Sequence, residues 1–128
     1  REYYPLTSQL PIVDIIKCYG GADGRFVRCS WESGAKGIVL EAMGRGHVPP
    51  PMVEEIADVI KKGMKVVWTS SAVEGEVYTV YDFAGSAYDL KKSGVIFGKD
   101  YDSKKARIKL AVLLSAGVKN LQEKFIIW

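Results

Sequence analysis

The chain has 128 residues, of which 48% are hydrophobic and 26% are charged, and its formal net charge is +3. These values are typical of one globular domain and exclude a disordered or collagen-like chain. The lysines form scattered pairs, without a basic stripe interleaved with aromatic residues, so we expect no nucleic-acid partner. No apolar run reaches the roughly 18 residues that a membrane span needs, and no signal peptide is visible. We therefore expect a cytoplasmic protein.

The first predicted strand covers residues 10–19, which are rich in β-branched residues and show no strict alternation of polar and apolar positions. That pattern is typical of a strand covered on both faces. A glycine-rich turn at residues 20–24 leads into a short helix over residues 25–33. The side chains of this helix that we expect to face the core are Phe26, Cys29 and Trp31.

A second strand is predicted over residues 37–40. It is followed by a glycine-bracketed loop at residues 44–51 and by a helix over residues 51–62 that ends at Gly63. Apolar residues three or four positions apart form one stripe along this helix. They are Val53, Ile56, Ala57 and Ile60.

The alternation of strands and helices continues with a strand over residues 64–69 and then becomes irregular. Residues 70–81 are predicted to form an excursion, and residues 82–93 a helix that Gly85 interrupts. A fourth short strand is expected over residues 95–97.

The last predicted elements are helical. Asp102 and Ser103 can cap a helix that runs to about residue 116 and that offers apolar side chains for burial. Gly117 ends it, and residues 119–127 form a last short helix or turn. The side chains expected to be buried from the longer helix are Ile108, Leu110, Ala111 and Leu114.

Four short apolar strands linked by helices predict an α/β fold, in which an open parallel sheet forms the middle of three layers and carries helices on both faces. No linker, internal repeat or low-complexity tract divides the chain. We therefore expect residues 1–128 to form a single domain.

Ligands of such sheets bind beyond the carboxyl ends of the strands, where the loop at residues 44–51 would lie. Gly44 and Gly46 let the backbone turn sharply, and the following helix N-terminus favours an anion. The loop lacks the third glycine of a dinucleotide fingerprint and the Gly-Lys-Ser/Thr of a phosphate loop. Two interpretations stay open, a ligand-facing loop and a structural turn or subunit contact. In the first, Arg45 and His47 are the candidate chemical groups.

Other polar residues give weaker signals. His47 is the single histidine and has no cysteine or acidic partner at metal-ligand spacing, so we expect no metal site and no cofactor. Cys18 and Cys29 are interpreted as packing residues, with a bridge between them as the alternative. Asp14 is expected to bond to backbone or to an arginine. Ser70 and the adjacent Ser71 are interpreted as a strand-end turn rather than as a nucleophile.

The excursion also carries an aromatic and acidic cluster, for which a contact surface is favoured over a substrate edge. Its members are Tyr78, Tyr81, Asp82, Tyr88 and Asp89.

Several stretches together resemble the small C-terminal domain of the bacterial-type L-asparaginases. In order, they are PIVDIIKCYGGAD, GAKGIVLEAMGRGHVPP, GMKVVWTSS and GVIFGKDYDSKKARIKLAVLLSAG, which cover roughly residues 10–117. The resemblance implies a flavodoxin-like domain attached to a larger N-terminal domain that carries the chemistry. The family hydrolyses L-asparagine to L-aspartate and ammonia, with variable glutaminase activity.

In that family the nucleophilic threonine and its threonine, aspartate and lysine partners belong to the N-terminal domain. None of their motifs occurs in this chain, so the resemblance implies no catalytic residue here and no activity of the chain alone. A chain that begins at Arg1 is then expected to be a fragment, a separately expressed domain or half of a split enzyme.

The family's C-terminal domain supports a dimer or tetramer and lends a loop to the active site of the neighbouring subunit. The contributing residue is usually an asparagine after the second glycine of a Gly-x-Gly-Asn loop. That position is His47 in this chain, and Arg45 lies between the two glycines. The resemblance thus implies substrate contacts by both residues across the interface. It also implies an acidic residue from the excursion, for which the candidates are Glu76, Asp82 and Asp89.

Two alternatives stay open. One is the asparaginase-like part of the archaeal glutamyl-tRNA(Gln) amidotransferase, which has a similar Gly-x-Gly-His loop and would bring a tRNA partner. The other is a non-catalytic flavodoxin-like binding or assembly module.

Overall fold

The structure is a computed structural model that describes residues 3–4, 9–43, 47–70, 91–98 and 101–125. Its elements alternate as the sequence predicts. In chain order they are β1 (Val13–Lys17), α1 (Arg25–Glu32), β2 (Gly37–Ala42), the 3-10 helix η1 (Pro50–Met52), α2 (Val53–Lys61), β3 (Lys65–Ser70), β4 (Ile96–Phe97), α4 (Ser103–Ser115) and α5 (Leu121–Lys124).

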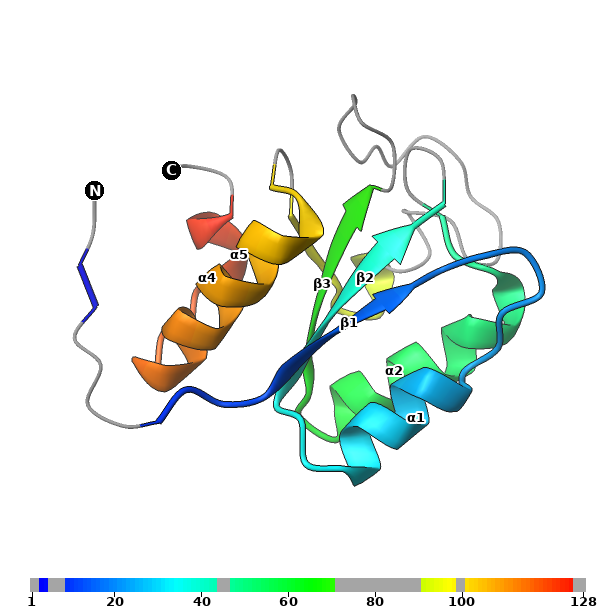
Figure 1. The fold of residues 1–128 in the computed structure, drawn as a ribbon, viewed down its shortest axis with the longest axis horizontal. Coiled ribbons are helices and arrows are strands. Elements are labelled where there is room, and N and C mark those ends of the chain that lie inside the picture. Colours follow the sequence, from blue (N-terminus) through cyan, green and yellow to red (C-terminus); the bar gives the residue numbers. More distant parts are fainter. Residues whose placement is uncertain (1–2, 5–8, 44–46, 71–90, 99–100, 126–128) are drawn as a thin grey trace.

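The strands form one sheet in the order β1-β2-β3-β4, and every pairing is parallel (Figure 1). In the register, Gly37 at the start of β2 lies opposite Val13 of β1 and Lys65 of β3. A parallel sheet needs a crossover between consecutive strands, and α1 and α2 supply the first two. The predicted α/β class and open parallel sheet are confirmed.

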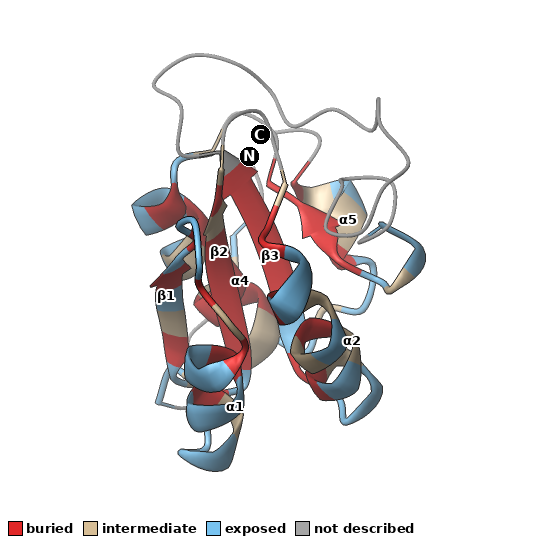
Figure 2. Ribbon diagram, turned by 90° about the vertical axis from the view of Figure 1, so that its right-hand side faces the viewer, coloured by how far each residue is buried: buried red, intermediate tan, exposed pale blue. Residues whose placement is uncertain are grey.

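The sheet is covered on both faces (Figure 2). One hydrophobic cluster joins it to α1 and α2, and a second joins the opposite face to α4 and α5. Alternate residues of β2 serve the two clusters, since Ile38 and Leu40 belong to the first and Val39 to the second. All three are fully buried, which explains why the strand shows no polar alternation.

The helices begin and end largely where local chemistry predicts. The Asp102 side chain accepts a 2.8 Å hydrogen bond from the Lys105 amide and caps α4. Gly63 and Gly117 follow α2 and α4 with φ of 107° and 71°, a region that glycine enters without strain. The α-helix predicted over residues 51–62 begins instead at Val53, after the 3-10 turn η1, whose first two residues are Pro50 and Pro51.

Two predicted core positions of α1 were wrong. Phe26 is 52% exposed and Cys29 is also exposed, whereas Val27 and Ser30 face the core. Trp31 packs against the core and is partly buried. The physical reason is that α1 lies beside the edge strand β1, so one side of the helix extends beyond the sheet and is not covered by it. Within the described residues, no further strand lies beyond β1.

The other helices show smaller differences from the prediction. Val59 is buried in α2 although the predicted stripe omitted it, and Ile108 of α4 is 54% exposed rather than buried. The predicted excursion and helix over residues 70–93 fall mostly outside the described residues, of which Lys91 and Lys92 are helical. No helix in the described part of the chain has the length and apolar character that a membrane span requires.

Candidate functional site

The loop after β2 is closed at its base by two backbone hydrogen bonds. The Met43 amide donates to the His47 carbonyl at 2.8 Å, and the His47 amide donates to the Met43 carbonyl at 3.1 Å. These bonds fix the backbone of His47 at the carboxyl end of the sheet, where ligands of parallel sheets bind. The three residues between them, including Arg45, lie outside the described residues.

The chain that leaves the loop is anchored in the core. Val48 is fully buried and Pro49 is buried beside it, whereas His47 is only half-buried. Pro49 has the extended φ of −56° and ψ of 135°, and η1 and α2 follow directly. His47 is therefore held between a paired backbone and a buried anchor, with its side chain still partly accessible to solvent.

Side-chain bonds fasten β2 to its neighbours just before the loop. The Ser103 hydroxyl, at the start of α4, donates a 2.7 Å hydrogen bond to Glu41 Oε1. On β3, Thr69 Oγ1 donates to the Leu40 carbonyl at 3.1 Å in a fully buried setting. The strand that leads to His47 is thereby tied to α4 and to β3.

The two described cysteines lie in different environments. Cys18 is buried, and burial first and the Glu41 charge second raise the pKa of its thiol from 9.0 to about 12. It stays neutral at physiological pH, which removes its nucleophilic form. Cys29 is exposed, and both residues are free thiols. The packing interpretation was therefore right for Cys18 and wrong for Cys29.

The turn between β1 and α1 is stabilised by hydrogen bonds between two of its own residues. Arg25 donates from its amide and from its guanidinium to the Asp23 carboxylate at 3.0–3.1 Å. The Arg25 side-chain and backbone hydrogen bonds lower the pKa of Asp23.

Across the described residues, no group of three His, Cys, Asp and Glu side chains is arranged to hold a metal ion.

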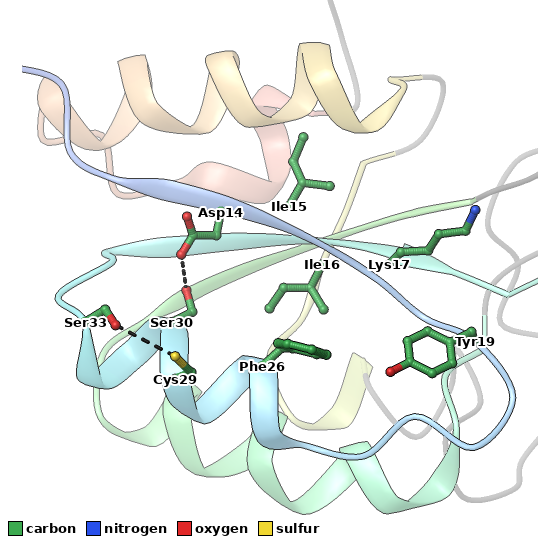
Figure 3. Close-up of a pocket in the computed structure, with 9 residues that line it drawn as sticks. All are labelled: Asp14, Ile15, Ile16, Lys17, Tyr19, Phe26, Cys29, Ser30 and Ser33. Carbon is green, nitrogen blue, oxygen red and sulfur yellow. Dashed lines mark hydrogen bonds between the residues drawn. The ribbon is translucent and has the colours of Figure 1, made fainter.

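A hollow of about 460 Å³ lies between β1 and α1 (Figure 3), and His47 is not among the residues that line it. Its lining includes Asp14, whose Oδ2 accepts a 2.7 Å hydrogen bond from the Ser30 hydroxyl. The expectation that Asp14 bonds to backbone or to an arginine was wrong. The sequence offered no signal for this pair or for the bond between Glu41 and Ser103, because the partners come from different elements.

Several predicted site residues cannot be placed because they lie outside the described residues. They are Arg45, Ser71, Glu76, Tyr78, Tyr81, Asp82, Tyr88 and Asp89.

Comparison with known proteins decides the family. The family described as the glutaminase/asparaginase C-terminal domain matches residues 12–125. The chain belongs to this family. An L-asparaginase from Bacillus licheniformis is 55% identical over 125 residues, which is 98% of this chain and 39% of that protein. The match confirms the resemblance drawn from the sequence.

Two further relatives broaden the comparison. The crystal structure of a probable cytoplasmic L-asparaginase from Campylobacter jejuni superposes with a TM-score of 0.82 at 31% identity, over 95% of this chain and 38% of that one. One of the subunits of a glutamyl-tRNA(Gln) amidotransferase from Methanosarcina mazei is 35% identical over 81% of this chain and 24% of the relative. This asparaginase C-terminal domain thus spans about two-fifths of these two asparaginases and about a quarter of the amidotransferase polypeptide.

Proposed function

We propose that this chain is the C-terminal domain of an L-asparaginase, which hydrolyses L-asparagine to L-aspartate and ammonia in the cytoplasm. The observation that carries the proposal is the 55% identity to the Bacillus licheniformis L-asparaginase over nearly the whole chain. The catalytic threonines belong to an N-terminal domain, with which this domain associates. The chain alone has no hydrolytic activity.

The role of this domain in the reaction is to position a polar loop. His47 takes the place of the family's asparagine and reaches the active site of a neighbouring subunit in a dimer or tetramer. The paired backbone of Met43 and His47 and the buried Val48 support this role, because they hold the loop without using the imidazole in the pairing. A neutral imidazole can donate or accept a hydrogen bond, which suits contact with the substrate's ammonium group or with the threonine network. Arg45, two positions earlier in the sequence, supplies positive charge.

The test is the substitution His47→Ala in the full-length enzyme that contains this chain, followed by ammonia release from L-asparagine. Loss of one hydrogen bond to a charged group corresponds to about 1.5–3 kcal/mol, so kcat/KM is expected to fall by roughly tenfold to a hundredfold. Lys61→Ala, on the exposed end of α2, is the matched control. An unchanged kcat/KM for His47→Ala removes His47 from the site, and a wild-type enzyme that releases no ammonia refutes the asparaginase function.

The second candidate is the asparaginase-like part of an amidotransferase that acts on glutamyl-tRNA(Gln). It is supported by the 35% identity to the Methanosarcina mazei amidotransferase polypeptide and by the histidine after the second glycine of the loop. The same full-length protein distinguishes the two. Ammonia release that requires charged tRNA and a partner subunit favours the amidotransferase, and release from asparagine alone favours the asparaginase.

A further inference from the structure

Glu41 is the polar exception in the otherwise buried strand β2. It is half-buried, and the other residues of the strand are buried. Its side chain lies on the face of the sheet that α4 covers, because it alternates with Val39, which belongs to the hydrophobic cluster on that face. The register between β1 and β2 ends at Glu41, opposite Lys17. Two residues later, Met43 begins the paired base of the loop that carries His47.

The hydroxyl donor for Glu41 is held in a fixed position. Ser103, the first residue of α4, is 7% exposed and donates to Glu41 Oε1 at 2.7 Å. Asp102 caps the helix directly before it. Tyr101 packs edge-on against Phe125, with ring centroids 5.6 Å apart. The start of α4 is therefore anchored by contacts other than this bond, so the bond determines where the Glu41 side chain lies.

The loop is fastened from the two faces of the sheet by different kinds of side-chain contact. On the face that α1 and α2 cover, Val48 is fully buried and Met43 packs against the same hydrophobic cluster. On the face that α4 covers, the bond from Ser103 reaches β2 two residues before the loop. Hydrophobic attraction has no preferred direction, whereas a hydrogen bond restrains both distance and angle. Of these side-chain contacts, the hydrogen bond is therefore the one that fixes the direction in which β2 enters the loop.

We propose that Glu41 and Ser103 are positioning residues for asparagine hydrolysis, which fix the direction in which β2 presents His47 to the substrate. The inference rests on the proposed function, which gives His47 a substrate contact. Glu41 and Ser103 make no such contact themselves and act through the paired backbone of Met43 and His47. Even a small displacement of a contact group lowers a reaction rate. Removal of the bond therefore weakens catalysis although neither residue touches the reacting atoms.

A second bond in the chain provides a matched control. The Ser30 hydroxyl of α1 donates to Asp14 Oδ2 of β1, also at 2.7 Å. Ser30 is 6% exposed, close to the value for Ser103, and both carboxylates are half-buried. Asp14 lies opposite Ile38, three positions before Glu41 along β2. Ser30→Ala and Ser103→Ala thus remove the same kind of bond at a similar depth, one far from the loop and one next to it.

The first measurement is amide hydrogen exchange at Met43 and His47 in the full-length enzyme that contains this chain, resolved to single residues by fragmentation in the mass spectrometer. Ser103→Ala is expected to accelerate exchange at both amides by roughly tenfold, the effect of losing one bond to a charged group. Ser30→Ala is expected to leave both unchanged, because loop amides exchange through local opening. Equal acceleration in the two variants, or unchanged exchange in Ser103→Ala, overturns the proposal.

An apolar replacement separates positioning from stability. Glu41→Leu combined with Ser103→Ala removes donor and acceptor together, so no carboxylate is left without its bond and part of the lost stability returns. The direction of the strand is still no longer fixed by a hydrogen bond, so exchange at Met43 and His47 should stay fast. Return of slow exchange in this double variant overturns the proposal, since packing alone would then hold the loop.

A conservative replacement separates positioning from charge. Glu41→Gln keeps a side-chain oxygen that accepts from the Ser103 hydroxyl. We therefore expect its kcat/KM and its exchange at His47 to stay close to those of the wild type. A Glu41→Gln variant as impaired as Ser103→Ala would show that Glu41 acts through its charge, and would overturn the proposal.

The second measurement is ammonia release from L-asparagine. Ser103→Ala is expected to lower kcat/KM by roughly threefold to tenfold, less than His47→Ala, because the imidazole is displaced but still present. In the His47→Ala background, Ser103→Ala should lower kcat/KM no further, since a residue that acts through His47 has nothing left to position. An equal fall in both backgrounds would show that Ser103 acts independently of His47 and would overturn the proposal.

The two measurements also separate this inference from the proposed function. Normal asparagine hydrolysis together with unchanged exchange in Ser103→Ala refutes the inference alone. Accelerated exchange in Ser103→Ala, with no hydrolysis by the wild-type enzyme, refutes the proposed function and the catalytic part of the inference, while the hold of the bond on the loop stands.

Discussion

The hydroxyl of Ser103 and the carboxylate of Glu41 are joined by a 2.7 Å hydrogen bond, although 62 positions separate them in the sequence. The bond ties the first turn of α4 to the end of β2, two residues before the paired loop that carries His47. The carboxyl end of the sheet is therefore held together by a side chain from β2, which precedes the candidate loop in the sequence, and one from α4, which follows it.

Removal of this bond is expected to destabilise the domain. Ser103→Ala leaves the half-buried Glu41 carboxylate without its donor, which corresponds to a loss of about 1–3 kcal/mol in the free energy of unfolding. Urea denaturation measures the difference. Adding Glu41→Leu to Ser103→Ala removes the unbonded acceptor and should recover part of the loss. A double variant that is less stable than Ser103→Ala would contradict this explanation.

The stability of the domain is expected to fall in alkaline solution because of Cys18. The folded state raises the pKa of this thiol from 9.0 to about 12. Above pH 9 the unfolded chain loses the proton while the folded chain keeps it, so the free energy of unfolding falls as pH rises from about 9 toward 12. Below pH 9 both states are protonated, and the effect vanishes.

Urea denaturation at several pH values between about 8 and 11 checks this slope. Cys18→Ala should make the slope shallower, and Cys29→Ala, which changes an exposed thiol, should not. Equal slopes in the two variants would show that other groups account for the pH dependence.

The indole of Trp68 is expected to be replaceable by a smaller aromatic ring. Trp68 is fully buried, and its Nε1 is the one buried side-chain polar atom among the described residues without a hydrogen-bond partner. Its ring contacts Phe97 edge-on, with centroids 5.6 Å apart. Trp68→Phe removes the unpaired donor together with some volume, and should cost less than about 2 kcal/mol of unfolding free energy.

Trp68→Ala leaves a cavity and should cost about 3–5 kcal/mol by the same denaturation assay. If Trp68→Phe proved as costly as Trp68→Ala, the indole N–H would have to be bonded, and the orphaned donor would be ruled out.

Gln122 of α5 is expected to protect the Phe97 amide of β4 from hydrogen exchange, because its side chain bonds to both backbone groups of Phe97. Gln122→Ala removes both hydrogen bonds to the Phe97 backbone, and amide exchange at Phe97 should accelerate by roughly tenfold, as expected for a loss of about 1.4 kcal/mol in local stability. Gln122→Glu keeps the acceptor and loses the donor, so its exchange rate at Phe97 should lie between those of the wild type and of Gln122→Ala. Unchanged exchange at Phe97 in Gln122→Ala would mean that the β4 edge is covered by something else.

Much of the fold was predictable because its signals are local. β-branched segments marked the strands, and Asp102 and the glycines marked the helix ends, as the structure confirms. The loop at His47 was also found locally, from two glycines that follow a buried strand. Family membership came from the order of several such segments.

The errors have two causes, and the first is that sequence does not reveal which strand is at the edge of the sheet. Phe26 looks like a core residue of a short helix, and only the position of α1 beside β1 explains its exposure. The partners Ser30 for Asp14 and Ser103 for Glu41 were missed because each pair is formed by packing between distant elements. No local pattern specifies such contacts.

The pairing of Met43 with His47 separates the shape of the loop from its chemistry. Both bonds run between backbone groups, so they place no demand on which side chain occupies position 47. An asparagine and a histidine can therefore be exchanged there on an unaltered backbone. Under the proposed function, the polar group offered to a substrate then changes without any rebuilding of the strand beneath it.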